Sequence, residues 1–256
     1  LINIVVVPSY LKKVPAATRA IYRTLSLGVE IADLATIYET AFGKIPLAEL
    51  EEVWFLENLS RNREIYDAVK QPTQILLAAI LFAALSPLFL LIAATLKLTS
   101  PGSAFFTQVR IGKGGKPFVL WKFRTMRLDA EKNGPQWAAP DDRRTTPVGR
   151  VLRAAHLDEL PQLINIVRGE LSLIGPRPER PEFVEQLRQE IPFYDLRHLI
   201  KPGLTGWAQI NYRYGASVEE AREKLQYDIY YLKNRSLWLD ATIALKTAKR
   251  FFVNAS

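Results

Sequence analysis

The chain of 256 residues has no cysteine, two histidines and one methionine. Without cysteine, it has no disulfide bond, no thiolate metal site and no cysteine nucleophile. His156 and His198 are too few for a zinc site of the three-histidine kind. Its chemistry must therefore rest on carboxylates, hydroxyls, lysine or arginine. Because the single methionine is Met126 and the chain begins at Leu1, we expect it to be a piece of a longer protein.

Positive charge is concentrated beyond the first seventy residues. The chain has 34 Lys and Arg against 26 Asp and Glu, a net charge of +8, although residues 1–70 hold 8 basic and 9 acidic side chains. Eleven basic and four acidic residues lie between positions 110 and 153. This basic window suits an anionic partner, which is an acidic lipid head group, a phosphorylated substrate or nucleic acid.

An uncharged apolar run from Ile75 to Leu96 indicates a protein that is embedded in a membrane. Its 22 residues are enough to cross a hydrocarbon core, which needs about 20. A buried core helix is the alternative, but such helices seldom run so long without a polar break. Ser86 and Pro87 stand at the midpoint, and a proline inside a helix removes a backbone hydrogen bond and forces a kink.

The kinked segment either bends and still crosses the membrane or turns back as a re-entrant hairpin with both ends on one face. Lys70 precedes the segment and Lys97 follows it, so the basic bias of the cytoplasmic side is present at both ends. The flanks therefore favour the re-entrant hairpin, broken at Ser86 and Pro87.

The residues before this segment predict a β-α-β fragment. Residues 2–8 read as a buried strand, 16–26 as a helix and 28–31 as the start of a second strand. No phosphate-binding glycine fingerprint accompanies them, so we interpret them as the end of a domain and not as a nucleotide site. Residues 47–69 predict a charged amphipathic helix that leads to the membrane.

After the apolar segment, two β-prone runs at 104–110 and 117–126 flank the glycine-rich residues 112–116, which predicts a β-hairpin. Helices are predicted over 161–167, 182–190 and 218–253, the last as one or two helices. Tyr227, Tyr230, Tyr231 and Trp238 in this last region suit either interfacial helices, with aromatic rings at head-group level, or an ordinary core.

Two adjacent carboxylates, Asp158 and Glu159, precede Pro161 at a predicted helix start. On these residues alone, the simpler interpretation is that Asp158 caps the helix. The functional interpretation is that the pair shares Mg²⁺, which takes few protein carboxylates and completes its shell with water and phosphate oxygens. A carboxylate among Mg²⁺ and arginines can also attack phosphorus, because the cations neutralise the repelling charges.

Two loops rich in proline and glycine follow, at 175–181 and 201–211. The first holds Arg177 and Arg180 on a stiffened backbone, which suits the binding of phosphate oxygens. For either loop taken alone, a structural turn is the simpler interpretation, although rigidly held polar loops often carry function.

Five blocks, in this order, resemble the bacterial sugar transferase family, the monotopic polyprenyl-phosphate phosphoglycosyltransferases. The blocks are SP (86–87), KFRTM (122–126), LDELPQL (157–163), GPRP (175–178) and KPGLTGW (201–207). The resemblance covers about residues 70–253. Residues 1–60 resemble the end of the Rossmann-like regulatory domain that precedes the catalytic part in longer members.

The resemblance implies transfer of a sugar 1-phosphate from a UDP-sugar to undecaprenyl phosphate with release of UMP, the first membrane step of exopolysaccharide, capsule or O-antigen synthesis. It implies that Asp158 is the nucleophile that forms an aspartyl phosphosugar and that Glu159 assists Mg²⁺ binding or proton handling. His156 departs from the Ser or Thr common at that place in the family. The predicted phosphate-binding residues are Lys122, Arg124, Arg153 and Arg177.

The predicted fold is a mostly helical α+β fold with a re-entrant membrane hairpin, interfacial amphipathic helices, a small β-hairpin and a partial Rossmann-like β-α-β fragment. We expect the regulatory remnant and linker at 1–60, the lead-in and re-entrant helix at 61–99, and the catalytic domain at 100–256, on the cytoplasmic face of the bacterial inner membrane. The expected partners are a UDP-sugar, undecaprenyl phosphate and anionic membrane lipids; a homodimer is compatible with the sequence.

Two other classes of function compete with this enzyme. A membrane-surface scaffold would use the basic window to bind anionic lipid without turnover. Nucleic-acid binding rests on charge alone, and since the sequence contains no recognition motif for it, we expect no nucleic-acid partner. Among the sugars, glucose, galactose and an N-acetylated sugar all stay open.

Overall fold

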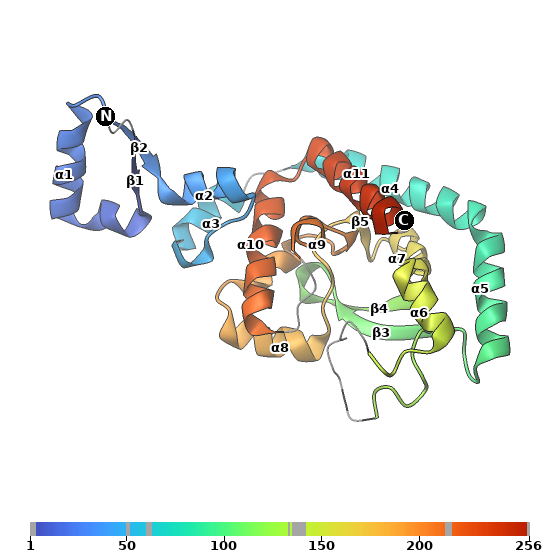
Figure 1. Cartoon of the computed structure of the whole chain (residues 1–256). Coiled ribbons are helices and arrows are strands. Elements are labelled where there is room, and N and C mark those ends of the chain that lie inside the picture. The colour runs from blue at the N-terminus through green and yellow to red at the C-terminus, as the bar shows by residue number, and fades with distance from the viewer. Residues whose placement is uncertain are drawn as a thin grey trace.

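The computed structural model describes residues 4–49, 52–59, 63–132, 134, 142–212 and 217–254. The fold is a mostly helical α+β fold, as expected, with three two-stranded sheets among the described residues. Figure 1 shows a small N-terminal unit, residues 4–33, beside a larger body formed by the described residues from 34 to 254.

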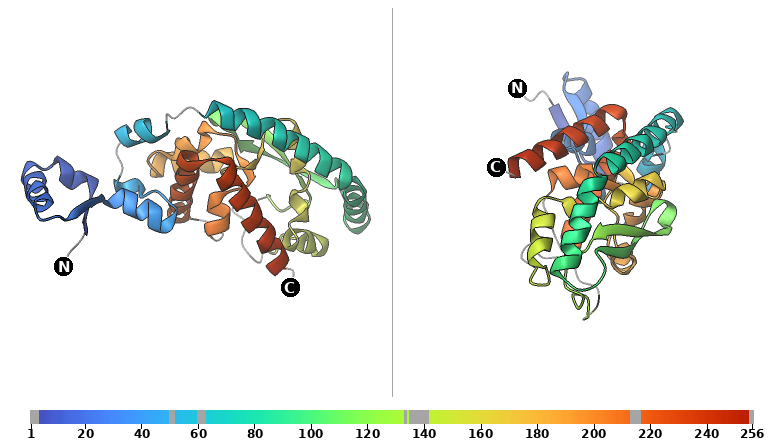
Figure 2. Two further views of the ribbon diagram at one scale, coloured as in Figure 1. Left: turned by 90° about the horizontal axis from the view of Figure 1, so that it is seen from above. Right: turned by 90° about the vertical axis from the view of Figure 1, so that its right-hand side faces the viewer.

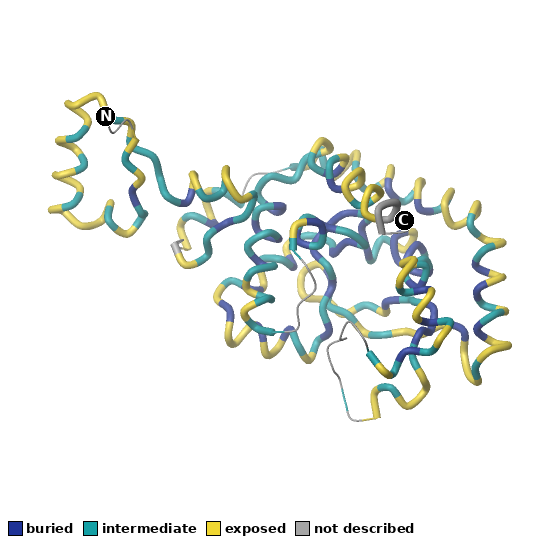
Figure 3. The backbone as a smooth tube through the Cα atoms, in the orientation of Figure 1, coloured by how far each residue is buried: buried dark blue, intermediate teal, exposed yellow. Residues whose placement is uncertain are grey.

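The N-terminal unit is the predicted β-α-β fragment. Strand β1 (Ile4–Val7) pairs in parallel with β2 (Glu30–Asp33), and helix α1 (Pro15–Leu25) connects them after a short 3-10 turn, η1 (Ser9–Lys13). The unit protrudes from the body in Figures 1 and 2. Most of its residues are exposed or half-buried (Figure 3), because two strands and one helix enclose little core.

Residues 34–59 contribute to the core of the body. Helix α2 (Leu34–Phe42), the 3-10 turn η2 (Leu47–Glu49) and helix α3 (Glu52–Leu59) form this stretch. Its buried side chains Ala35, Ile45 and Phe55 belong to a cluster with residues of α8 (Pro181–Glu190) and α10 (Val218–Asn234). The indole N–H of Trp207 also donates a 2.6 Å hydrogen bond to the carbonyl of Gly43.

The predicted continuous helix over 47–69 is wrong. Helix α3 ends at Leu59 and α4 begins at Glu64, while residues 60–62, which include the expected domain boundary, lie outside the described residues. Arg63 has non-helical backbone angles, and its guanidinium donates to the carbonyls of Lys233 and Arg235 at the end of α10. These tertiary hydrogen bonds hold Arg63 in a non-helical conformation, which the amphipathic pattern of the sequence does not predict.

The apolar segment forms two helices, α4 (Glu64–Ala84) and α5 (Ser86–Thr99), bent by 59°. The predicted kink at Ser86 and Pro87 is confirmed: Pro87 lies in the first turn of α5, and the Ser86 hydroxyl donates a 2.8 Å hydrogen bond to the carbonyl of Ala83. Among the described residues, no single helix is long and apolar enough to cross a membrane, although this bent pair together passes by length and composition.

The bent pair has two different faces. One packs into the body, where Ala78, Phe89 and Leu96 are buried against β4 (Pro117–Phe123), α6 (Pro147–Ala154) and α7 (Gln162–Val167). The other is exposed and apolar and includes Leu76, Ile80, Leu90 and Leu91. The pair is therefore more than a buried core helix, and the re-entrant hairpin stays a prediction. The two flanking lysines differ: Lys97 is exposed, whereas the Lys70 side chain lies inside a polar network.

The remaining elements surround the predicted hairpin, which is confirmed. Strands β3 (Phe105–Ile111) and β4 (Pro117–Phe123) pair antiparallel around the 3-10 turn η3 (Lys113–Gly115), and β5 (Ser172–Ile174) pairs in parallel with β6 (Gly203–Thr205). The helices and 3-10 turns of this part are α6 (Pro147–Ala154), η4 (Leu157–Glu159), α7 (Gln162–Val167), η5 (Tyr194–Leu199), α9 (Trp207–Asn211) and α11 (Leu237–Asn254).

The four aromatic residues near the C-terminus divide between the two interpretations. Tyr231 is a core residue, Tyr227 is half-buried, and Tyr230 stacks on Trp207 with ring centroids 5.5 Å apart. Trp238, on α11, is 82% exposed. Among these rings, Trp238 has the exposure that contact with a membrane interface requires.

Candidate active site

Asp158 and Glu159 lie in η4, the turn that joins α6 to α7. The chain reverses at His156, which adopts the left-handed conformation with φ of 54°, a region where His is more common than most residues with a Cβ. Pro161 occupies the N-cap position of α7, and no side chain caps either η4 or α7. The interpretation of Asp158 as a helix cap is therefore wrong.

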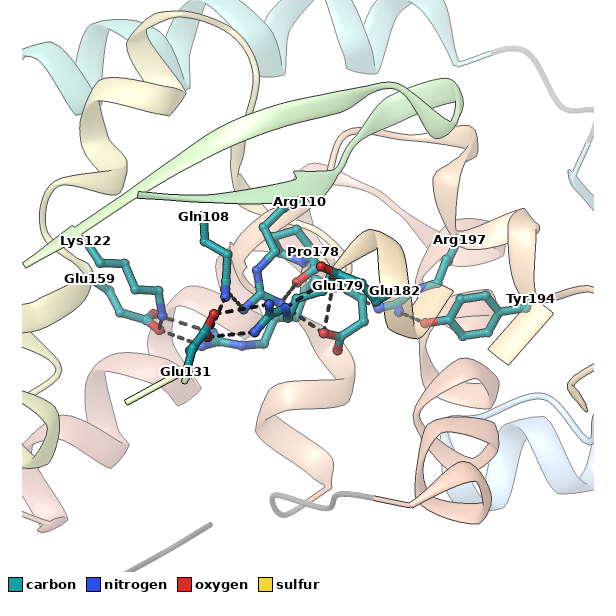
Figure 4. Close-up of polar contacts among 12 residues, drawn as sticks. Gln108, Arg110, Lys122, Glu131, Glu159, Pro178, Glu179, Glu182, Tyr194 and Arg197 are labelled. Carbon is teal, nitrogen blue, oxygen red and sulfur yellow. Dashed lines mark hydrogen bonds and ion pairs between the residues drawn. The ribbon is translucent and has the colours of Figure 1, made fainter. Parts of the chain in front are cut away.

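Glu159 is tied to two cations from different elements (Figure 4). Lys122 Nζ on β4 lies 2.8 Å from its Oε1, while Arg177 donates to Oε1 at 2.5 Å and to Oε2 at 3.4 Å. Burial alone would raise the pKa of Glu159, but the charges and hydrogen bonds of Arg177 and Lys122 outweigh it and hold the pKa far below its ordinary range. Glu159 is thus ionised at neutral pH and joins the hairpin to the loop of Arg177.

Asp158 is built in the opposite way. Its side chain is buried, and among the described residues its carboxylate has no hydrogen bond and no ion pair. Burial raises its pKa, and the charge of Glu159 adds to this, while the charges of Lys122, Arg153 and Arg177 lower it only in part. Neighbouring carboxylates whose pKa values move apart are typical of sites in which one of them reacts.

Arg153 adds a positive charge on α6. Its Nε donates to the Thr125 hydroxyl at 2.9 Å and its Nη1 to the Thr145 hydroxyl at 3.2 Å. Both partners are neutral, so the charge stays available to an anion. Thr125 and Thr145 lie close together because Met126 and Thr145 form an isolated β-bridge. Local sequence patterns do not predict this contact, since the residues are far apart in the chain.

Arg124 is held elsewhere. Its guanidinium donates to the carbonyls of Pro101 and Ser100 at 2.5 and 3.1 Å and to the Ser100 hydroxyl at 2.7 Å. These groups follow the C-terminus of α5, so Arg124 fastens the end of the bent pair to β4. Of the four predicted phosphate-binding residues, the structure therefore places Lys122, Arg153 and Arg177 around the two carboxylates, and Arg124 apart from them.

The two loops rich in proline and glycine are neighbours. Gly175 donates to the carbonyl of Thr205 at 2.9 Å, and Gly203 donates to that of Pro176 at 2.8 Å. A Cβ on Gly203 or on Gly206 would lie 2.1 Å from a backbone atom of Gly175. The backbones therefore meet at a distance that only glycine allows, and the second loop supports the first.

Ion pairs fix the loop of Arg177 along its length (Figure 4). Glu179 pairs with Arg110 at 2.9 Å and Arg180 with Glu131 at 2.8 Å. Arg197, itself paired with Asp228 at 2.9 Å, donates to the backbone carbonyl of Arg177 at 2.8 Å. Sequence reasoning missed Glu131, Arg197 and Asp228 as supports, since each acts across a long sequence separation.

The carboxylates suit Mg²⁺ unequally. Among the described residues, no group of three or more His, Asp and Glu side chains is placed to hold a metal ion. Glu159 has its oxygens on Lys122 and Arg177, whereas the Asp158 carboxylate is without such partners in the described part. Because Mg²⁺ needs only one or two carboxylates when phosphate oxygens and water complete its shell, Asp158 fits the ion and Glu159, as arranged, does not.

Comparison with known proteins gives one family. A family model described as "Bacterial sugar transferase" matches residues 65–254. The chain is 42% identical over 221 residues to the UDP-N-acetylgalactosamine-undecaprenyl-phosphate N-acetylgalactosaminephosphotransferase of Aeromonas hydrophila, an alignment that covers 86% of this chain and 52% of the relative.

Two further relatives are described as UDP-glucose:undecaprenyl-phosphate glucose-1-phosphate transferases. The protein of Escherichia coli K12 is 42% identical over 73% of this chain and 40% of its own length. The protein of Caulobacter vibrioides is 44% identical over 72% of this chain and 70% of its own. The chain thus spans about half the length of the first relatives it matches.

Proposed function

Because the chain belongs to the bacterial sugar transferase family, we propose that it transfers a sugar 1-phosphate from a UDP-sugar to undecaprenyl phosphate and releases UMP. The relatives act on UDP-glucose or UDP-N-acetylgalactosamine by their descriptions, so these are the first donors to test. The observation that carries the proposal is the buried Asp158 carboxylate, without a partner in the described part, beside three cations.

In the first step, an Asp158 oxygen attacks the phosphorus next to the sugar. A bond forms between that oxygen and phosphorus, the bond from phosphorus to the bridging oxygen breaks, and UMP leaves with the electron pair. Arg153, Lys122 and Arg177 offset the negative charge that would otherwise repel the carboxylate. The raised pKa of Asp158 makes its anion a stronger nucleophile than an ordinary aspartate once it is ionised.

In the second step, a phosphate oxygen of undecaprenyl phosphate attacks the same phosphorus. The bond between phosphorus and Asp158 breaks, the carboxylate is regenerated, and the product is undecaprenyl diphosphate sugar. The covalent intermediate means that the water-soluble donor and the lipid acceptor need never be bound together.

Asp158 and the phosphate oxygens of the donor would hold Mg²⁺, with Glu159 acting through its two cations. When bound, the ion would neutralise charge on the diphosphate. The exposed apolar face of the bent pair, with Leu90 and Leu91, supports an association with the cytoplasmic membrane, where the acceptor resides. Anionic lipids would bind the basic window.

The proposal is tested by isotope exchange with the purified chain in detergent. Incubated with Mg²⁺, labelled UMP and a UDP-sugar, but without undecaprenyl phosphate, the chain should move label into the UDP-sugar, because the first step is reversible on its own. Transfer without exchange would exclude the aspartyl intermediate. If UDP-glucose, UDP-galactose and their N-acetylated forms all fail to give UMP when acceptor is present, the enzyme is excluded, and salt-dependent binding to anionic liposomes would favour the scaffold.

A further inference from the structure

Helix α4 carries a polar stripe on its inner side. Tyr66, Lys70 and Gln74 are spaced four residues apart, so they lie on one face of the helix. The Gln74 side chain is buried, and its Oε1 accepts from the Ser172 hydroxyl at 2.7 Å and from the Leu173 N–H at 3.1 Å. A single amide group thus holds two residues of strand β5.

Lys70 holds the third residue of the same strand. Its Nζ lies 2.9 Å from the carbonyl oxygen of Ile174, 2.7 Å from the Tyr231 hydroxyl and 3.0 Å from Asp240 Oδ2. The Lys70 side chain is only 14% exposed. An ammonium group has three donors and is costly to bury unless they are used, so these contacts fix the position of β5 relative to α4, α10 and α11.

Strand β5 leads directly to the candidate active site. It ends at Ile174, Gly175 packs on the second loop, and Arg177 then reaches Glu159. Only two residues separate Ile174, which Lys70 binds, from Arg177. A shift of β5 along or away from α4 would therefore move the Arg177 guanidinium relative to Glu159.

We propose that Lys70 and Gln74 are positioning residues for the transfer reaction: they fix β5 so that Arg177 stands at Glu159 and at the donor phosphates. This inference rests on the proposed function. It gives α4 two roles, since the same helix offers apolar side chains to its surroundings and polar ones to the strand before the catalytic loop. The seating of the bent pair is thereby coupled to the geometry of the active site.

The test is a double-mutant cycle on kcat/KM for UDP-sugar, with the full chain in detergent. Lys70→Met should lower kcat/KM by about 10- to 100-fold, and Arg177→Lys should also lower it. If Lys70 acts through Arg177, the double variant will be within about threefold of Arg177→Lys alone, because the position that Lys70 secures no longer matters. Lys97→Met is the matched control: it removes an exposed lysine from the same helix pair, should change kcat/KM less than about twofold, and should be additive with Arg177→Lys.

Two further variants separate positioning from a loss of folded protein. Gln74→Met removes the amide but no charge and should show the same non-additivity with Arg177→Lys. Leu187→Ala lowers the Tm through a core cluster on α8 and α10 that does not include β5, and it should leave kcat/KM unchanged well below its Tm. Additive cycles, or an equal loss in Leu187→Ala, would overturn the inference. No transfer by the unsubstituted chain would overturn the proposed function and this inference with it.

Discussion

The two halves of the candidate active site, one around Asp158 and one around Glu159, are adjacent in sequence but opposite in construction. Asp158 is buried and the Glu159 side chain is 14% exposed, so desolvation raises the pKa of each. Glu159 receives Lys122 and Arg177 as direct partners, and its pKa falls; Asp158 receives none in the described part, and its pKa rises. The difference teaches that partners, more than burial or residue type, divide the work between neighbouring carboxylates.

Each half also has its own structural task. The Glu159 half joins β4, through Lys122, to the loop of Arg177, so it belongs to the framework of the body. The Asp158 half contains a carboxylate that has no hydrogen bond or ion pair among the described residues, and Arg153, whose partners there are hydroxyl groups. A substitution in the Glu159 half should therefore lower both stability and activity. A substitution in the Asp158 half should lower activity alone.

Asp158→Asn gives the largest expected effect and the clearest test of that contrast. The amide cannot attack phosphorus, so UMP release and label exchange should fall by at least about 10³-fold. The Tm in detergent should stay the same or rise, because the amide removes a buried charge that has no direct partner among the residues the structure describes. Glu185→Gln on the exposed side of α8 is the matched control. Activity that survives in Asp158→Asn would place the nucleophile elsewhere.

Glu159→Gln should give a smaller loss of activity but a real loss of stability. Neutralising Glu159 removes the carboxylate charge that lies between Lys122 and Arg177, at a cost of about 2 kcal/mol. For a chain of this size that corresponds to a fall in Tm of about 4–8 °C, and kcat/KM should drop by about 10- to 100-fold as the two cations shift.

The stability difference has a definite sign with pH. Because the folded-state pKa of Glu159 is lowered, its ionised form stabilises the fold at all pH values above the unfolded pKa of about 4.3. The gap in Tm between the unsubstituted chain and Glu159→Gln should therefore be full at pH 7 and shrink as the pH falls below about 4. A gap that does not depend on pH would assign the loss to packing and not to charge.

The smallest expected effect is a shift in the acid limb of the pH–rate profile, which tests the ionisation of Asp158. Asp158 must be ionised to attack, and its pKa is raised, so kcat/KM should fall on the acid side with a midpoint above that of an ordinary aspartate. Arg153→Gln removes a charge that favours the anion, so the midpoint should move to still higher pH. Arg188→Gln, an exposed substitution on α8, should leave it in place. If Arg153→Gln leaves the midpoint unchanged, the charge of Arg153 does not act on Asp158.

Local patterns in the sequence predicted most elements of this fold. The kink at Ser86 and Pro87, the hairpin around residues 112–116 and the β-α-β fragment follow from proline, glycine and apolar periodicity over short distances. The break between α3 and α4 was not predictable in this way, because Arg63 finds its partners at the end of α10. Neither was the contribution of Ala35, Ile45 and Phe55 to the core of the body.

The site was predictable in its residue types but not in its division of roles. The resemblance to the sugar transferase family brought Asp158, Glu159, Lys122, Arg153 and Arg177 together as candidates. Nothing local separated Arg124 from them, since only the folded chain brings its guanidinium to the end of α5. The contacts of Lys70 were not predictable for the same reason: the sequence shows a lysine that flanks an apolar run, while its partners Ile174, Tyr231 and Asp240 lie more than a hundred positions away.

The contact of Gly175 with Gly203 and Gly206 has a consequence for any saturation mutagenesis of this protein. There is no room for even one methyl group between these backbones, so nearly every substitution at the three positions should abolish activity, although none of them offers a side chain to a substrate. A fitness map would mark them as strongly as Asp158. The sensitivity of these glycines to substitution would reflect how closely the two loops must approach each other. Without the structure, the same data would suggest that the glycines take part in catalysis.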